Sequence, residues 1–196
     1  MSDRTKAPVV RLVPNPAKVT EAILLVLACA EERKVDVSQY DIVKTIFLAD
    51  KRHLNRFGRP ITFDNYFAMR HGPVPSMVYD LLKGTQAVAD KHGTKIEWVR
   101  SVVEGRPQAS FKARRGPNLD ELAPSEVELL RDCFGAVKSL GFSEIRRLTH
   151  EDAAYLDAWE DSGGENSSYP MSLGMMFDVP NMVTAKELAF ISKHAA

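Results

Sequence analysis

The chain has 196 residues, and its 26 basic and 26 acidic side chains leave no formal net charge. This length suits one domain with its own core, and the charge balance argues against a dedicated nucleic-acid coat or a polybasic membrane binder. The longest apolar run, residues 22–30, is far shorter than the roughly 20 residues of a membrane span, and the N-terminus has no secretory pattern. We therefore expect a cytoplasmic protein that neither enters nor contacts a membrane.

The two cysteines support this expectation. Cys29 and Cys133 are too few for the disulfide framework of a small secreted domain, and neither belongs to a CxxC pair. Each falls within the apolar pattern of a predicted helix. We interpret both as small core residues in a reducing compartment.

Residues 1–17 form a proline-rich arm. Pro8, Pro14 and Pro16 surround a short apolar string, a composition that blocks helix and favours extended backbone. We expect a flexible arm or an edge strand here. Residues 18–196 are then a single globular domain, made of helices and a turn over 18–84, a β-hairpin over 91–115 and an acidic helical part over 120–196.

Two helices open this domain. The first is predicted over residues 18–33, and it is apolar almost all the way round, which is typical of a central, buried helix. The second begins at Ser38, an N-cap residue with Asp41 three positions later, and ends at Gly58. On its helical wheel Lys44 falls on the polar side.

Asp50 and His53 fall in the middle of the apolar side of this second helix. A buried carboxylate needs a partner, and His53 is close enough to be one. Two interpretations follow: a tie that fixes the helix on the following turn, with Arg70 or His71 as further partners, or a proton acceptor at a catalytic site. The tie is the commoner arrangement, and we adopt it.

The next segment mixes strand and turn signals. Residues 59–70 are rich in aromatic and apolar residues, and residues 71–75 contain two prolines that predict a rigid turn before a short helix ending at Gly84. Residues 96–103 and 109–113 predict a β-hairpin around 104–107. We expect a small antiparallel sheet of about three strands, with the Tyr66 region as the third.

Helices return after Pro124. One is predicted to stop at Gly141, a second to begin at Ser143, a third to open with Thr149 and Asp152, and a last one to begin with the capping box of Thr184 and Glu187. The fold class is therefore mainly α, a compact helical domain with a small antiparallel β-sheet inserted between its N- and C-terminal helices.

Catalytic and metal motifs are absent from the sequence. The five histidines are scattered, with no HExxH and no paired cysteines, and no phosphate-binding loop, GxGxxG or GxSxG occurs. We expect no enzyme, no cofactor and no metal site. Basic residues around the hairpin, interleaved with Trp98 and Phe111, fit a nucleic-acid patch, an ordinary solvated sheet face or the site of an acidic partner protein.

A series of blocks in the centre of the chain resembles the SocA-like Panacea-domain antitoxin family. Residues 44–54, 58–62, 66–69 and 72–79 carry the resemblance by their order and spacing, and a second block runs from Thr149 to a tryptophan. The resemblance covers roughly residues 18–159. Its motif residues, structural or toxin-binding, are Lys44, Asp50, His53, Gly58, Arg59, Pro60, Tyr66, Gly72, Pro73, Val74, Tyr79, Thr149, His150 and Trp159.

The resemblance implies an antitoxin of a bacterial toxin-antitoxin system that binds its cognate toxin protein and catalyses nothing. For the family's type member it further implies a proteolytic adaptor that delivers the toxin to the ClpXP protease. Arg4, Lys6 and Arg11 of the arm are then candidates for a protease tether. Two alternatives stay open: a plain toxin-neutralising binder without protease delivery, and a DNA-binding regulator of its own operon.

The zero net charge conceals an uneven distribution. Residues 1–119 carry 20 basic and 12 acidic side chains, a net of +8, whereas residues 120–196 carry 6 and 14, a net of −8. The two parts either attract each other within the fold or offer opposite patches to two partners. The sequence leaves open which, and it leaves the oligomeric state open.

Overall fold

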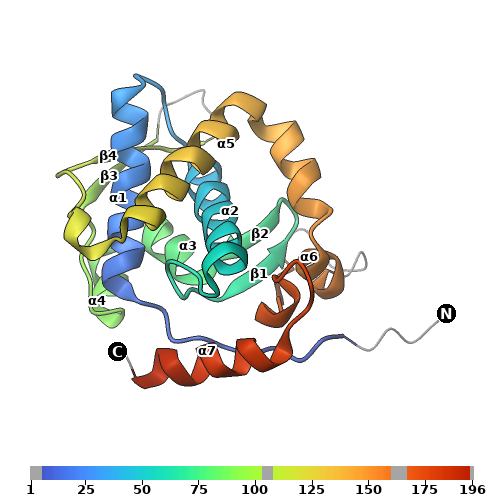
Figure 1. The fold of residues 1–196 in the computed structure, drawn as a ribbon. Coiled ribbons are helices and arrows are strands. Elements are labelled where there is room, and N and C mark those ends of the chain that lie inside the picture. Colours follow the sequence, from blue (N-terminus) through green and yellow to red (C-terminus); the bar gives the residue numbers. More distant parts are fainter. Residues whose placement is uncertain (1–5, 103–107, 160–166, 195–196) are drawn as a thin grey trace.

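The computed structural model describes residues 6–102, 108–159 and 167–194. Within them the chain is mainly helical, with a three-stranded antiparallel sheet and a separate two-stranded hairpin. Figure 1 shows α2 at the centre, with α1 on one side, α5 across it and the sheet on the other side. The predicted fold class is confirmed.

The first two helices follow the sequence signals closely. α1 (Pro16–Glu32) is buried on every side, as its apolar wheel predicts, and Asn15 is its N-cap. α2 (Gln39–Phe57) begins with the capping box of Ser38 and Asp41 and ends at Gly58, whose φ of +76° is the left-handed conformation that favours glycine at this position. Both predicted ends of α2 are therefore confirmed, whereas α1 begins two residues before its predicted start, because Pro16 occupies the first turn of the helix, where proline is tolerated.

The sheet is built differently from the prediction. β1 (Tyr66–Met69) pairs with β2 (Gly72–Pro75) on one side and with β5 (Tyr169–Pro170) on the other. The predicted turn over 71–75 is thus wrong: the turn lies at residues 70–71, and the two prolines belong to an edge strand, where their missing N–H groups break no ladder.

The predicted hairpin is present as β3 (Trp98–Ser101) and β4 (Ser110–Ala113). It does not include β1 as a third strand, and its predicted turn lies outside the described residues. Two short helices, α3 (Ser76–Lys83) and α4 (Gln86–Lys91), precede it. Asp64 fixes the start of α3, because its carboxylate accepts hydrogen bonds from Met77 N and Val78 N, each at 3.0 Å.

A short 3-10 helix, η1 (Leu119–Glu121), leads into α5 (Pro124–His150), the longest helix. α5 packs against both α1 and α2, and it breaks at Gly141, where φ is +73°. This break was predicted. The N-cap of α6 (Ala153–Ala158) is Asp152, whose side chain accepts from two backbone N–H groups. Thr149 lies in the last turn of α5 and does not open the next helix as predicted.

The C-terminal part consists of the 3-10 helix η2 (Leu173–Met175) and α7 (Met182–His194). α7 begins two residues before the predicted capping box, because Asn181 accepts the hydrogen bond from Thr184 N at 3.0 Å. The described part of the arm, residues 6–15, runs beside α7 (Figure 1).

The arm is extended but attached along its described length. Leu12 is buried, its N–H donates to Asn65 Oδ1 at 2.9 Å, and Val13 N donates to Ser192 Oγ at 3.0 Å. A flexible arm is therefore the wrong description of residues 6–15. The reason is apolar burial: Leu12 belongs to a second core, formed with β1, α6, η2 and α7 beside the main core around α1 and α2.

Both cysteines lie in the main core, with Cys29 and Cys133 at 2% and 0% exposure. Burial raises the pKa of the Cys133 thiol to about 11 and also raises that of Cys29. In the part of the chain that the structure describes, no helix is long and apolar enough to cross a membrane.

Candidate functional site

The first cluster of motif residues surrounds Asp50, in the C-terminal half of α2. This carboxylate is completely buried and accepts hydrogen bonds from Ile61 N at 2.8 Å, Thr62 N at 3.0 Å, the Thr62 hydroxyl and the Tyr66 hydroxyl at 2.7 Å. Burial raises the pKa of Asp50, and the donors from Thr62 and Tyr66 oppose that shift. The four bonds tie α2 to the segment that leads into β1.

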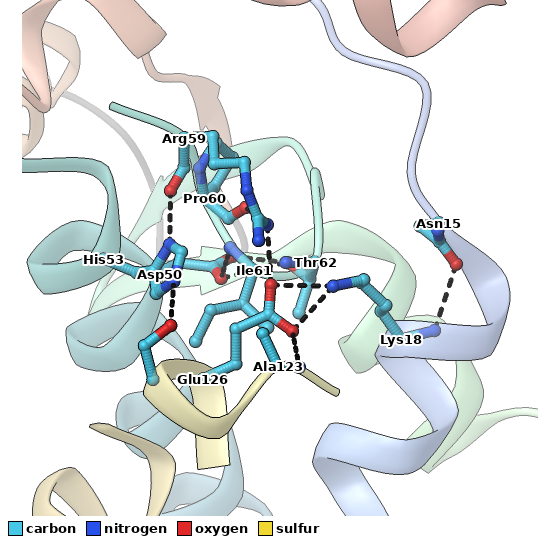
Figure 2. Close-up of polar contacts among 11 residues, drawn as sticks. Asn15, Lys18, Asp50, His53, Arg59, Pro60, Ile61, Thr62, Ala123 and Glu126 are labelled. Carbon is cyan, nitrogen blue, oxygen red and sulfur yellow. Dashed lines mark hydrogen bonds and ion pairs between the residues drawn. The ribbon is translucent and has the colours of Figure 1, made fainter. Parts of the chain in front are cut away.

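The predicted partners of Asp50 are therefore wrong in detail. His53 turns away from it: Nδ1 donates to the carbonyl of Arg59 at 2.7 Å, and Nε2 lies 3.2 Å from Ser125 Oγ (Figure 2). Burial lowers the pKa of His53, so the neutral ring accepts from the Ser125 hydroxyl. A backbone carbonyl orients this imidazole, where a catalytic Ser-His pair would have a carboxylate.

A buried ion-pair group lies beside these bonds. Glu126, at the start of α5, is fully buried and accepts from Lys18 Nζ and from Arg59 Nη1, each at 2.6 Å, and from Ala123 N at 2.9 Å. Burial alone would raise the pKa of Glu126. The hydrogen bonds that it accepts, above all from Lys18 and then from Ala123 and Arg59, hold this pKa below its usual value. As Figure 2 shows, α1, α2, α5 and the buried turn at Pro60 meet at this point.

The second cluster surrounds Lys44, in the N-terminal half of α2. The predicted polar position of Lys44 is wrong, since its side chain is 1% exposed and Nζ donates to the carbonyl of Pro73 at 2.7 Å. β2 and the end of α5 cover this side of the helix. Gly72 makes room: a Cβ there would lie 2.7 Å from Thr149 Oγ1 and 2.8 Å from Lys44 Nζ, and φ is +95°.

Burial and neighbouring positive charges lower the pKa values of the basic groups in this cluster. The pKa of Lys44 lies well below its usual value, first because of burial and then because of the charge of Arg146. Burial, Arg146 and Lys44 also lower the pKa of His150, to about 4, and that of His71 is lowered by burial and by the same cations. His150 Nε2 is buried and has no hydrogen-bond partner among the described residues.

A cavity of about 730 Å³ opens beside Lys44, and we call it the basic cavity. It lies between α2, the β1–β2 turn, α3, the β3–β4 hairpin and the second half of α5. Its basic side chains are Lys44, Arg70, His71 and Arg100, and its aromatic ones are Tyr40, Tyr79 and Phe142. None of the described residues that line it is an aspartate or a glutamate.

The aromatic wall of the basic cavity is ordered by mutual contacts. The rings of Tyr40 and Phe142 lie 4.7 Å apart, the Tyr40 hydroxyl donates to the carbonyl of Phe142 at 3.3 Å, and His71 meets Phe142 edge-on at 5.7 Å. Burial raises the pKa of Tyr40 to about 12, so its hydroxyl stays protonated. Lys44 Nζ lies 5.4 Å from the Tyr40 ring centroid, within cation–π range.

A second cavity, of about 650 Å³, lies between α2, α5, the two residues that follow α5 and Asp178. Its charges are mixed: Lys51, Arg52 and Arg56 face Glu151, Asp152 and Asp178, and Lys51 forms an ion pair with Asp152. This cavity therefore supplies its own counter-charges.

The remaining predicted residues are placed as follows. Val74 and Tyr79 line the basic cavity, and Lys83 Nζ donates to the Tyr79 hydroxyl at 2.6 Å. Trp159 stacks on Tyr155, whose hydroxyl donates to the carbonyl of Met69 in β1 at 3.1 Å.

The tether candidates do not form a free basic surface. Lys6 donates to the carbonyl of Ala158 at 3.0 Å and Arg11 lies 5.9 Å from the Phe67 ring, so both contact the domain. Arg4 lies outside the described residues, as do Ala195 and Ala196.

Sequence reasoning missed Glu126 and Arg146, which complete the two clusters. Glu126 had one available signal, its position three residues after Ala123 at a helix start with proline, which is a capping pattern. Arg146 had none. Among the described residues, no group of three His, Cys, Asp or Glu side chains is placed to hold a metal ion.

Comparison with known proteins assigns the chain to a family. No curated protein and no solved structure matches the chain significantly. The family model described as antitoxin SocA-like, Panacea domain, matches residues 42–155, which is more than half of the chain and includes Lys44, Asp50 and Thr149. The protein therefore belongs to the SocA-like antitoxin family with a Panacea domain.

Proposed function

We propose that this protein is a cytoplasmic antitoxin that neutralises a cognate toxin protein by binding it directly, without catalysing a reaction. The match of residues 42–155 to an antitoxin family carries the proposal. The polar cluster around Asp50 supports it, because hydrogen bonds within the fold account for each of its buried groups, and no reacting atom is presented to a substrate.

Co-expression with the neighbouring open reading frame tests this function. If that frame encodes the toxin, its expression alone stops growth, and this protein restores growth and co-purifies with the toxin at a fixed ratio. Loss of growth rescue, with both proteins expressed and soluble, contradicts the proposal.

The finer proposal is delivery of the bound toxin to the ClpXP protease, as the resemblance implies for the family's type member. An adaptor holds substrate and protease together, which raises the effective substrate concentration at the protease to about the millimolar range. In a reconstituted assay, toxin is degraded only when this protein and ClpXP are both present. Rescue with a stable toxin would instead identify a plain neutralising binder.

Removal of residues 1–17 tests the arm in the same assay. Because residues 6–15 are bound to α6, α7 and β1, their deletion exposes Leu12's site in the second core and lowers stability. Degradation that continues at the wild-type rate in the folded deletion variant excludes the arm, with Arg4, Lys6 and Arg11, as the protease tether.

The alternative of a DNA-binding regulator makes a different prediction. Binding to phosphates weakens steeply with salt, in proportion to the number of contacts neutralised. A gel shift with the operon's promoter that disappears between about 50 and 200 mM salt would favour this alternative. The zero net charge of the whole chain speaks against it.

A further inference from the structure

The second cavity lies between two arms of α5. The break at Gly141 divides α5 into a first arm, residues 124–140, and a second arm, residues 142–150. Figure 1 shows α2 beneath this bend, between the two arms. Leu129 of the first arm and Leu148 of the second both line the cavity, so it is a groove along α2 with one arm of α5 on either side.

The groove offers apolar surface along α2. This helix contributes a stripe from Phe47 to Arg56, about 14 Å long at 1.5 Å per residue. Phe47 is buried and Leu48 half-buried in this stripe, and Leu148, a large apolar side chain, is 39% exposed on the second arm. Exposed apolar side chains that gather at a hollow mark a surface for a binding partner.

The acidic groups of the groove lie beside the second arm. Lys51 of α2 forms an ion pair with Asp152, which follows that arm. Asn55, one turn later on α2, accepts a hydrogen bond from Asp178 N at 2.7 Å and so holds Asp178 on the same side. The Asp178 carboxylate forms no ion pair with any described residue.

The basic groups lie beside the first arm. Arg52 lies next to the thiol of Cys133 in that arm, and Arg56 follows Arg52 by one turn on the same side of α2. Both arginines are exposed, and within the described structure neither forms an ion pair. The charges of the groove therefore balance in number but are separated across it.

A helix is the kind of segment that such a groove accepts. None of the described residues that line it belongs to a strand, so an extended peptide finds no sheet edge to pair with. The backbone N–H and C=O groups of that peptide would lose water without gaining partners. A helix satisfies its own backbone, and an amphipathic helix lays its apolar side chains into a hydrophobic groove.

We propose that the second cavity is the toxin-docking site, and that it receives an amphipathic helix of the toxin, packed along α2 between the arms of α5. An apolar residue of that helix contacts Leu48 and Leu148, and an acidic one lies beside Arg52 and Arg56. A basic residue on its other flank faces Asp178. This inference rests on the proposed function and specifies its surface.

The first experiment removes the basic side of the groove. Arg52→Gln/Arg56→Gln is compared with Lys186→Gln/Lys193→Gln on α7, because each pair is exposed on a helix and includes one residue of its last turn. Affinity for the toxin encoded by the neighbouring frame is measured by calorimetry. We expect Kd to rise at least about tenfold for the first variant, and to change less than about twofold for the second.

The second experiment identifies the bound segment. A photo-crosslinking residue, p-benzoylphenylalanine, replaces Leu148 in the groove or, as the control, Phe190 on α7, both of which are exposed large apolar residues. We expect a crosslink from position 148 alone, to a toxin peptide with apolar residues three or four apart and an Asp or Glu among them. Changing that acidic residue to Lys should weaken binding to the wild type, and Arg52→Glu/Arg56→Glu should restore it.

The outcomes separate the two levels of the proposal. Unchanged toxin affinity in folded Arg52→Gln/Arg56→Gln, no crosslink from position 148 in a variant that still binds, or a crosslinked segment without the helical pattern overturns the docking site and leaves the antitoxin function standing. Loss of binding in the position-148 variant, with binding kept in the position-190 variant, supports the site. Failure of the wild type to bind the toxin overturns the proposed function itself.

Discussion

In the C-terminal half of α2, the buried carboxylate of Asp50 accepts four hydrogen bonds from Ile61, Thr62 and Tyr66. Six residues earlier, the buried amine of Lys44 donates to one carbonyl, that of Pro73, and its charged neighbours in the described structure are other bases. The same helix therefore carries two polar clusters. We call the Asp50 cluster closed, because four hydrogen bonds satisfy its carboxylate, and the Lys44 cluster open, because its amine makes one hydrogen bond and borders a cavity.

The difference separates structural from interaction roles within a single family motif. A buried group whose hydrogen bonds are complete contributes to stability and offers nothing to a partner. A buried base next to an open cavity, with no anion nearby, costs stability and gains from a partner that supplies one. On this view Asp50 maintains the fold, whereas Lys44 is the buried group that a partner could still stabilise.

The largest effect is expected at the closed cluster. Asp50→Ala leaves buried donors of Ile61, Thr62 and Tyr66 without an acceptor, and should lower the free energy of unfolding by about 3 to 5 kcal/mol. For a chain of this size that is roughly 6 to 20 °C in Tm, measured by calorimetry. Asp50→Asn, which keeps the shape and one acceptor, should lose less.

Toxin affinity gives this variant its second readout. Asp50→Ala should bind toxin normally at a temperature where it is still folded, because Asp50 is completely buried and its hydrogen-bond partners all lie within the fold. If Tm is unchanged and toxin affinity is lost, Asp50 is a contact residue and the contrast between the two clusters is wrong.

Gly72→Ala tests how tightly the open cluster is packed. The added methyl would lie 2.7 Å from Thr149 Oγ1 at a residue with φ of +95°, so we expect a loss of about 2 to 4 kcal/mol in urea unfolding. Gly93→Ala is the matched control, since it shares a positive φ of +67° but has open space around its Cβ. Its cost should be only about 1 kcal/mol, and equal losses for the two variants would contradict the close approach of β2 to α5.

Local signals predicted the ends of elements well. The capping box at Ser38, the glycine at 58, the break at Gly141 and the two strands of the hairpin all depend on residues close in sequence, and all are present. These features need no knowledge of the rest of the fold, because each is decided within one helical turn or one pair of strands.

The long-range features could not be predicted in this way. The wheel of α2 placed Lys44 on the polar side, but β2 and the end of α5 cover that side. Asp50 was correctly placed inside, yet its partners come from Ile61, Thr62 and Tyr66, which only the path of the following segment decides. A helical wheel gives the side of a residue and not the element that packs on it.

Glu126→Gln should have a smaller effect than the first two changes. It removes the charge that binds Lys18 and Arg59, but both cations are partly exposed and can be solvated, so we expect a loss of about 1 to 3 kcal/mol at pH 7. Glu128→Gln, at an exposed position of the same helix, is the control.

The pH dependence of this loss has a definite sign. The pKa of Glu126 is lower in the folded protein than its ordinary value of 4.5, so its stabilising contribution is complete above that pH and is lost on acidification. The difference between wild type and Glu126→Gln in urea unfolding should therefore shrink as the pH falls below about 4.5. A difference that stays constant down to pH 3 would show that the ion pairs contribute nothing.

The smallest effect on stability is expected for Lys44→Met, and its sign should depend on pH. The variant loses one hydrogen bond to Pro73 but no longer buries an amine beside Arg146, His71 and His150, so we expect a change within about 1 kcal/mol at neutral pH. Because the pKa of Lys44 is lower in the folded than in the unfolded chain, the unfolded wild type binds more protons up to about pH 10.5. Its stability therefore rises with pH relative to Lys44→Met.

Urea unfolding of both proteins at pH 6, 7.5 and 9 measures this trend, with exposed Lys112→Met as a control that should show none. A pH-independent difference would mean that Lys44 is paired with an anion in the folded protein, and the open cluster would then be as closed as that of Asp50.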